Sequence, residues 1–491
     1  MPSHPHTPVL VGCAQVRQRA EDPLTAREPL DLMEEACRLA AEDAQAPRLL
    51  AQATGIRVPR GIWSYSNPAA LLAERFSADR VETALGGFSG STVQQMLDDA
   101  ALSIEAGRHE VVVITGAECE HSKRRARRQG DALPRTEQVD SQPDLAFETS
   151  LDGFSRKLAE RGMRSAAHIF ALAECGLRAR GGEDLDAHRL RIATLWAGLS
   201  RVAEENPHAW IQRAMTPEEI LTPSADNRWI VFPYTKYLVS NAAVDMGAAL
   251  ILCSLQAADA AGVPDDRRVY LHAAVEAGGA APFAERQDIF LQPSLSIGAQ
   301  RLFELAEVGP EALDHVDLYS CFPSAVELAA EAVGLSTQRP LSVTGGLTFS
   351  GGPMNSYVLH STAGMMDRLR ADPGSLGLVS SLGGAIAKAA FALYSTRPPE
   401  GRLRFADVAL QVAELPRREF REDYTGEGTL EAYAPTMQGD EATDATCTCL
   451  LDGGERHFAL ARDPEILARM TSEELCGRRL RVLDGEVVAL L

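Results

Sequence analysis

Apolar and polar positions alternate in regular blocks along the first quarter of the chain. Residues 8–16 and 110–118 are nearly continuous apolar runs, which are typical of buried strands. Residues 29–44 place apolar side chains at helical spacing, and another helix is expected from about Ser91. Short apolar runs that alternate with helices predict a mainly parallel sheet with helices on both faces.

The pattern of residues 265–396 repeats that of the first half in outline. In the first half, GGFSGS (86–91) precedes a helix and the apolar run VVVITGAE. In the second half, GGLTFSGGP (345–353) precedes a helix and the run GLVSSLGG. Two such halves predict an internally duplicated α/β core, although the sequence identity between them is slight.

The remaining sequence has two other patterns. Residues 121–144 are polar and are expected to form a loop, and helices are predicted over 165–180 and 186–205. The last part of the chain has short alternating runs between turns rich in Gly, Pro and Asp. That pattern predicts a small β-barrel, similar to an OB fold, with one helix over 463–476.

These patterns divide the chain into four predicted parts, which suits a length of 491 residues. They are an N-terminal α/β half (1–120 plus 228–262), an α-rich insertion (121–227), a C-terminal α/β half (263–397) and an added β domain (405–491).

Composition and charge exclude several classes of protein. The net charge of −20 argues against binding nucleic acid through a basic surface, and the acidic turns of the β domain argue against a single-stranded nucleic-acid module. We expect no membrane span, because no apolar run of about 18 residues exists. The nine cysteines are scattered without zinc-site spacing, so no metal is expected, and a reduced cytoplasmic protein is the plain interpretation.

A series of motifs covers nearly the whole chain in a fixed order. They are NPAALLAERF, GGFSGST with GRHEVVVITGAE, YTKYLVSNAAVDMGAALIL, YSCFPSAVELAAEAVGL, GGLTFSGGPMNSY and GLVSSLGGAIAKAAFALYSTRPP. Together they resemble the thiolase superfamily, and more narrowly the bacterial thiolase-like proteins of type 1, relatives of sterol-carrier-protein thiolases. The resemblance implies a thiolase fold of five layers, αβαβα, and dimers in the wider family.

The same resemblance implies acyl exchange between coenzyme A and a cysteine, followed by making or breaking a carbon–carbon bond. That chemistry needs a thiolate at a helix N-terminus, a second cysteine as acid or base, and oxyanion holes. No resident cofactor is implied; a coenzyme A thioester would be the substrate or ligand.

Matched position by position, the motifs show replacements. Where related thiolases have C-A-T-G-S-T, this chain has GFSGST, so Gly87 stands at the nucleophile's position. In the H-D-C-F motif, Tyr319 replaces the histidine and Cys321 matches the cysteine, and in the G-H-P motif Gly352 replaces the histidine. Loss of one oxyanion donor typically costs about a hundred- to a thousand-fold in rate. Ordinary thiolysis or Claisen condensation is therefore not expected.

Each candidate residue has a functional and a structural interpretation. Cys321 is a candidate acid/base thiol or a small apolar filler, and Tyr319 either donates a hydrogen bond or blocks the site. His360 either lines the pocket or is structural. A ligand pocket is expected around Gly87, Ser89, Ser91, Gly351, Gly352 and Asn355, where the serines are either nucleophiles or helix caps.

The one dense basic run, residues 123–128, offers phosphate contacts at Arg124 and Arg125, or is a solvated face. Two hypotheses follow. One is an acetyl-CoA acetyltransferase-like acyltransferase of lipid or fatty-acyl metabolism that lacks the usual nucleophile. The other is a non-catalytic acyl-CoA-binding or scaffolding protein, a monomer or homodimer, whose C-terminal domain docks a protein partner.

Overall fold

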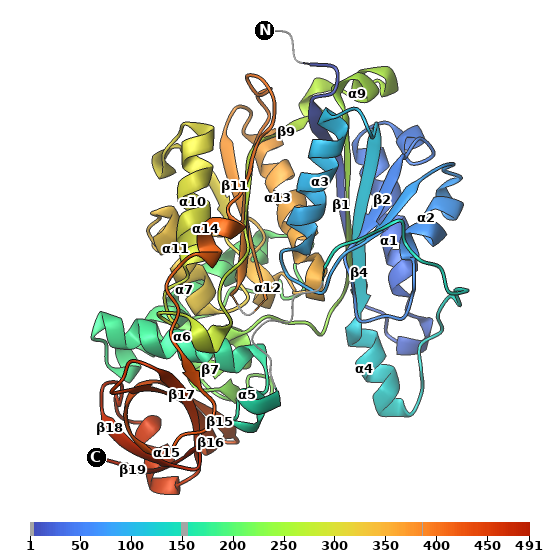
Figure 1. Ribbon diagram of the computed structural model, residues 1–491. Helices are drawn as coiled ribbons and strands as arrows, with labels where there is room; N and C mark the ends of the chain where they lie inside the picture. Colours follow the sequence, from blue (N-terminus) through green and yellow to red (C-terminus); the bar gives the residue numbers. More distant parts are fainter. Residues whose placement is uncertain (1–3, 149–155, 385) are drawn as a thin grey trace.

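The α/β core is built on one mixed sheet of eleven strands (Figure 1). The computed structural model describes residues 4–148, 156–384 and 386–491. The N-terminal half supplies strands in the order β3-β2-β4-β8-β1. Their bounds are β1 (Pro8–Arg17), β2 (Gly55–Val58), β3 (Glu82–Leu85), β4 (Val111–Cys119) and β8 (Asp245–Ser254).

The C-terminal half repeats this arrangement. Its strands follow the order β10-β11-β12-β9, and β9 joins β1 through two residue pairs. They are β9 (Val269–Ala277), β10 (His315–Asp317), β11 (Leu376–Gly383) and β12 (Lys388–Ser395). Beside β10, the amide of Leu318 donates to the carbonyl of Leu341 at 2.9 Å, where the N-terminal half has β3. The predicted duplication is confirmed.

Helices form the three α layers of the predicted αβαβα order, and the strands of the two halves form its two β layers. Two central helices, α3 (Thr92–Glu105) and α13 (Tyr357–Ala371), contact strands of both halves. The outer helices on one side are α1 (Pro29–Asp43) and α2 (Pro68–Phe76), with α9 (Leu255–Ala261) at the end of the sheet. Those on the other side are α10 (Pro293–Ala306) and α11 (Pro323–Val333).

The α-rich insertion begins with a helix where a loop was expected. Helix α4 (Glu120–Gln129) continues directly from β4. Lys123 and Arg124 lie one turn after Glu120 and pair with its carboxylate at 2.6 and 3.5 Å, which offsets repulsion within the basic run. The prediction of a loop over 121–144 is therefore wrong for its first nine residues. The other helices are α5 (Arg156–Glu160), α6 (Ala166–Gly181), α7 (Leu185–Glu205) and α8 (Pro217–Leu221).

After α4, the chain crosses the outer edge of the sheet as a strap, defined here as residues 131–148. Its strand β5 (Leu145–Ala146) pairs with β3 in parallel. Asp144 accepts hydrogen bonds at 2.8 Å from both the amide and the hydroxyl of Thr83. Gln138 bonds the backbone of Asn67, the residue that caps α2. The edge of β3 is thus covered by this chain itself.

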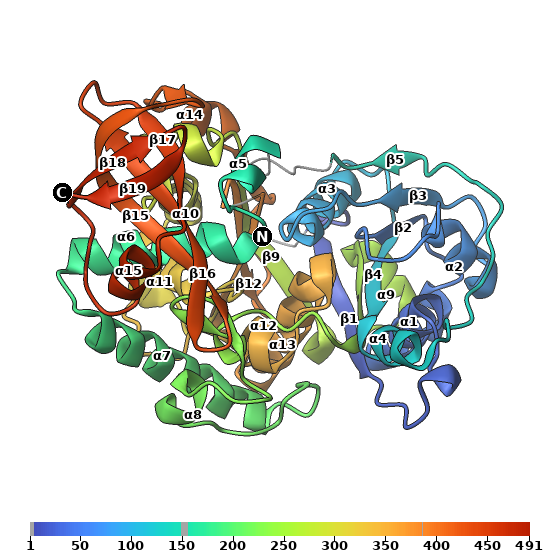
Figure 2. The ribbon, with the colours of Figure 1, turned by 90° about the horizontal axis from the view of Figure 1, so that it is seen from below.

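The C-terminal region contains a closed five-stranded barrel, as predicted (Figure 2). The pairing order β15-β16-β17-β19-β18 returns to β15, which is OB-like connectivity. The strands are β15 (Gly426–Gln438), β16 (Glu441–Leu451), β17 (Arg456–Ala461), β18 (Arg479–Leu483) and β19 (Glu486–Leu490), with α15 (Pro464–Met470) before β18.

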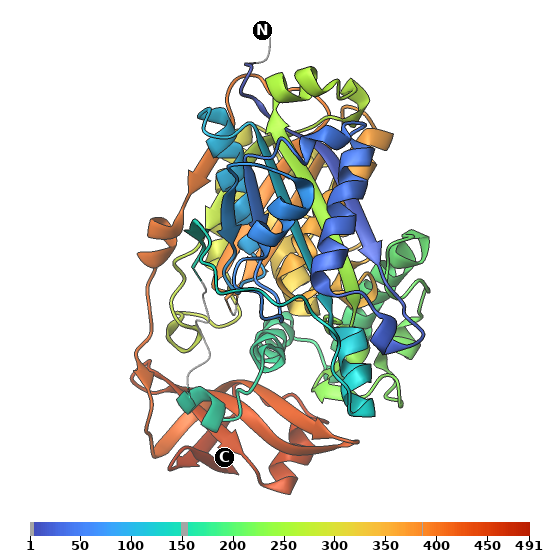
Figure 3. The same cartoon turned by 90° about the vertical axis from the view of Figure 1, so that its right-hand side faces the viewer.

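The barrel lies below the core, and α6 runs between them (Figure 3). The linker contains β13 (Arg404–Asp407), α14 (Ala409–Ala413) and β14 (Phe420–Arg421). Residues 409–415, one of the short alternating runs from which the β domain was predicted, therefore begin as a helix. Of segment 228–262, β8 and α9 complete the N-terminal half, while β6 (Trp229–Val231) and β7 (Tyr234–Thr235) join the barrel's sheet. Among the helices of the described ranges, none combines the length and the apolar composition that a membrane span requires.

Candidate functional site

The loop between β3 and α3 holds the position where thiolases carry their nucleophile. Gly87 is buried there, five residues before α3 begins. Ser89 and Ser91 are also buried, and their hydroxyl oxygens lie 2.9 Å apart. Ser91 precedes α3, but its hydroxyl makes no capping hydrogen bond to the helix. The loop therefore places two hydroxyls, and no thiol, at this helix end.

Tyr319 lies against the same loop from the C-terminal half. A Cβ atom at Gly90 would collide with the hydroxyl of Tyr319 and with the carbonyl of Leu382, so only glycine fits here. The ring of Tyr319 packs edge-on against Tyr357, with centroids 5.6 Å apart. Burial, together with nearby Cys321, raises the pKa of Tyr319 above its ordinary value. The phenol is therefore neutral near pH 7 and keeps its proton beside this loop.

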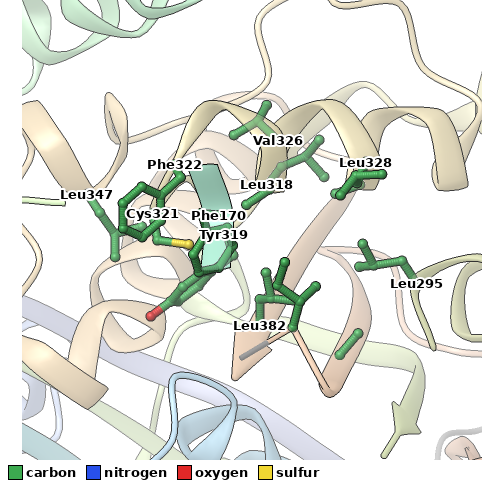
Figure 4. Close-up of a cluster of buried hydrophobic side chains, with 14 of the residues drawn as sticks. Phe170, Leu295, Leu318, Tyr319, Cys321, Phe322, Val326, Leu328, Leu347 and Leu382 are labelled. Carbon is green, nitrogen blue, oxygen red and sulfur yellow. The ribbon is translucent and has the colours of Figure 1, made fainter. Parts of the chain in front are cut away.

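Cys321 lies in an apolar environment (Figure 4). Its neighbours include Phe322, whose ring stacks on that of Phe170 from α6 at 4.3 Å. Burial raises the pKa of the Cys321 thiol. A neutral thiol can give a proton but is a poor nucleophile and a poor base. The structure thus brings Cys321 and Tyr319 together in one buried cluster, with Tyr319 in contact with the Gly87 loop.

The glycine-rich segment before α13 contains α12 (Gly346–Phe349) and the two glycines of the predicted pocket. Gly351 has φ of +110°, and a Cβ there would lie 2.6 Å from the sulfur of Met246. At Gly352 a Cβ would meet only ordinary contacts with Leu347, at 3.4–3.5 Å. Asn355 donates from Nδ2 to the carbonyl of Arg60 at 2.6 Å. Backbone geometry therefore requires glycine at 351, whereas position 352 has room for a small side chain.

His360 lies on α13, fully buried. Its Nδ1 lies 3.0 Å from Oε1 of Gln15, on β1. Burial, with a smaller effect from His208, lowers the pKa of His360 to about 3. The imidazole is therefore neutral at physiological pH, and it hydrogen-bonds a core strand through Gln15.

Arg124 and Arg125 lie on α4. Arg124 pairs with Glu120, and Arg125 donates to the carbonyl of Ala20 at 2.6 Å. A cavity of about 770 Å³ opens beside this helix, and sequence analysis did not predict it. From the basic run it is lined by Lys123 and Arg127 rather than by the two arginines proposed. Its other lining residues include Trp63, Tyr65, Glu118, Leu133 and Arg135.

A buried carboxylate next to the site was also missed. Asp317, at the end of β10, accepts hydrogen bonds from Ser342 at 2.8 Å and from Tyr357 at 3.1 Å. Thr344 completes the group, 2.8 Å from the Tyr357 hydroxyl. Burial raises the pKa of Asp317 to about 6, against the lowering effect of these donors. One sequence signal was available: a carboxylate stands between two apolar residues, Val316 and Leu318.

Comparison with known proteins supports the interpretation of this fold. No protein-family model matches the chain. The crystal structure of a monomeric SCP2-thiolase like protein type 1 from Mycobacterium smegmatis is similar at a TM-score of 0.84 and 28% identity, covering 98% of each chain. An acetyl-CoA acetyltransferase of Methanothermobacter thermautotrophicus is 25% identical over 217 residues, 39% of this chain and 55% of that protein. The chain therefore matches about half the length of this curated relative.

More distant structures share the fold. Human mitochondrial 3-ketoacyl-CoA thiolase in complex with CoA has a TM-score of 0.55 at 15% identity, covering 79% of this chain and 97% of that one. The Ltp2-ChsH2(DUF35) aldolase has a TM-score of 0.58 at 19% identity, covering 80% of this chain and 99% of that one. At these identities the likeness concerns architecture, and function depends on the residues of the site.

Proposed function

The chain belongs to the thiolase-like superfamily, and on that premise we propose that it binds an acyl-CoA thioester without performing ordinary thiolysis or Claisen condensation. This proposal depends on Gly87, which stands where thiolases have their nucleophilic cysteine. The proposed acyl site is the buried loop before α3, with Tyr319 against it and Cys321 in the adjoining cluster. The physiological setting that we propose is lipid or fatty-acyl metabolism.

The absence of a side chain at Gly87 removes the covalent step. A thiolase forms an acyl-thioester on the enzyme, which requires a sulfur where this chain has a hydrogen. Within the part of the chain that the structure describes, the hydroxyls of Ser89 and Ser91 hydrogen-bond each other and no histidine. Without a base to take the proton, a hydroxyl is a weak nucleophile.

Two residues keep chemistry that a bound thioester could use. Tyr319 is a neutral donor against the loop, and Cys321 is a neutral thiol. A neutral donor stabilises developing negative charge on a carbonyl oxygen. If the protein is catalytic, we propose that Tyr319 provides this hydrogen bond and that Cys321 gives a proton as the acid.

The alternative is a non-catalytic acyl-CoA-binding or scaffolding protein, in which the C-terminal barrel docks a protein partner. Burial favours this alternative, because Tyr319 and Cys321 are both buried and their raised pKa values are far from those of an efficient base.

A binding experiment with a catalytic arm tests both functions. The full chain is titrated by calorimetry with acetyl-CoA, longer acyl-CoAs and free coenzyme A, and acyl transfer is assayed in parallel before and after Cys321→Ala. Turnover that Cys321→Ala abolishes supports the acyltransferase, whereas binding without turnover supports the alternative. Absence of binding at millimolar concentrations of every thioester contradicts both.

A gain-of-function variant tests the assignment of position 87. Gly87→Cys, incubated with acetyl-CoA, is expected to gain one acetyl group, because the acetyl group passes from coenzyme A to the new thiol and free coenzyme A leaves. Intact mass measures this gain. Ser91→Cys, four residues along the same buried loop, is the matched control and is expected to remain unmodified. Acetylation of the control alone would place the nucleophile's position elsewhere.

A further inference from the structure

Two cysteine sulfurs meet where the α-rich insertion contacts the C-terminal barrel. The Sγ of Cys175, on α6, lies 3.4 Å from the Sγ of Cys476, in the segment between α15 and β18. The two residues are 301 positions apart in sequence. The amide of Tyr433, on β15, donates to the Cys175 sulfur at 3.4 Å. Residues from three separate segments of the chain therefore meet at the Cys175 sulfur.

A buried cation accompanies the pair. Nη2 of Arg178 lies 3.3 Å from the Cys175 sulfur and 2.9 Å from the Tyr433 hydroxyl, and its Nε donates to Glu474 at 2.6 Å. Burial alone would raise the pKa of Cys175, but the hydrogen bond with Cys476 and the guanidinium charge bring it below the ordinary thiol value. A thiolate is thus favoured at Cys175, and the thiolate is the reactive form of cysteine.

Exposure separates Cys476 from the other eight cysteines. Of the nine cysteines, eight are buried, and Cys476 alone is partly exposed. A solute can therefore reach Cys476 first, and Cys175 stands behind it at van der Waals distance. An accessible cysteine next to a second, resolving cysteine is the arrangement of many oxidant-sensing pairs.

We propose that Cys175 and Cys476 are a peroxide-reactive dithiol that closes to a disulfide and fastens the barrel to α6. The Cys476 thiol passes its proton to the Cys175 sulfur 3.4 Å away, and the resulting Cys476 thiolate attacks one oxygen of a hydroperoxide. The O–O bond breaks, Cys476 becomes a sulfenic acid, and the departing oxyanion takes the proton back from Cys175. The Cys175 thiolate then attacks that sulfur, the S–S bond forms, and hydroxide leaves and takes up a proton. With hydrogen peroxide, two thiols give one disulfide and two waters, and two electrons pass from the sulfurs to the peroxide.

The disulfide would link α6 covalently to the C-terminal barrel, which otherwise contact each other only through noncovalent interactions. The same boundary carries the Arg178–Glu474 ion pair, which one disulfide would reinforce. Helix α6 also carries Phe170, which packs on Phe322 beside Cys321. Oxidation is therefore expected to fix the barrel relative to the helix that covers the Cys321 cluster.

Peptide mapping of the full chain tests the proposal. The protein is treated with hydrogen peroxide near neutral pH, denatured in an alkylating reagent and digested. We expect a Cys175–Cys476 cross-linked peptide, the loss of two of the nine free thiols, and full reversal by dithiothreitol. Oxidation of Cys476 to sulfinic acid without a cross-link, or a disulfide between other cysteines, would overturn the proposal.

Two variants distinguish the pair from general thiol oxidation. Cys476→Ser should prevent the cross-link and leave Cys175 alkylated after denaturation. Cys447→Ser, which removes a buried thiol of the barrel, should leave the cross-link unchanged. A proteolysis time course on the wild-type protein gives a second readout, in which oxidation should slow cleavage between core and barrel. Equal cleavage rates for the oxidised and reduced forms would show that no fastening occurs.

Discussion

The two halves of the core place a buried charged residue at the third position of their second strand, and they stabilise it in opposite ways. In the N-terminal half, Arg57 on β2 donates to the carbonyl of Met96 at 2.8 Å and pairs with Asp99, both on α3. In the C-terminal half, Asp317 on β10 accepts from Tyr357, on α13, and from Ser342. Each charge therefore ties a strand to the central helix of its own half.

The difference concerns protonation. The guanidinium of Arg57 keeps its charge at all ordinary pH values and has carboxylate partners. Asp317 is surrounded by neutral donors, so that burial dominates and its pKa rises to about 6. One architecture thus contains one permanent charge and one charge that physiological changes of pH can remove.

The largest expected effect comes from removing the permanent charge. Arg57→Met leaves Asp99 and the Met96 carbonyl without their partner, and should lower the free energy of unfolding by about 3 kcal/mol. Urea denaturation measures it. Arg38→Met, in an exposed pair with Glu34, is the control and should cost less than about 1 kcal/mol. Equal losses in both variants would show that the Arg57 pair is not energetically special.

The second effect is a change in pH dependence. Because the pKa of Asp317 rises from 3.8 to about 6 on folding, the native state binds more protons, and stability falls as pH increases between these values. The shift is worth up to about 3 kcal/mol. Asp317→Asn, neutral like the protonated carboxyl, should remove this slope, so the stability of the variant relative to wild type should increase by up to about 3 kcal/mol as pH rises from 4 to 7. A constant difference across that range would contradict the raised pKa.

A smaller effect should follow from weakening the donors around Asp317. Tyr357→Phe removes a hydrogen bond to the carboxylate, should cost about 1 to 1.5 kcal/mol, and should move the titration of Asp317 to higher pH. The same pH series measures it. Tyr394→Phe removes a hydroxyl whose contact with Gln94 is 3.4 Å, and should change stability less.

The smallest effect concerns the outer edge of the N-terminal half. Asp144→Ala removes the acceptor of the Thr83 amide and should cost about 1 kcal/mol. Hydrogen exchange at the Thr83 amide should become faster, while Asp140→Ala, on the same strap, should leave it unchanged. Unchanged protection in both variants would mean that the strap does not depend on Asp144.

Sequence analysis recovered the fold because its signals are local. The apolar runs of β1 and β4, the duplicated glycine-rich turns and the alternating runs of the barrel each depend on neighbouring residues. Helix α4 was missed because five of six residues over 123–128 are basic, and the stabilising Glu120 lies just before them. The helix at 409–413 was missed because one and a half turns carry too few positions to show a period.

The site was only partly predictable. The motif match pointed to Tyr319 and Cys321, which the structure brings together near the Gly87 loop, and their roles remain predictions. The Asp317 network joins positions 317, 342 and 357, and the strap joins Thr83 to Asp144 across 61 residues. No local pattern encodes such contacts, because they form only when distant segments pack together.

The strap has a consequence for self-association. An uncovered edge strand offers unpaired backbone groups to any matching strand, which can join two copies or start aggregation. Here β5 and the Asp144 carboxylate already occupy the outer side of β3. A second copy could pair with this side of β3 only after displacing the strap, so the strap and a second copy would compete for the same backbone groups.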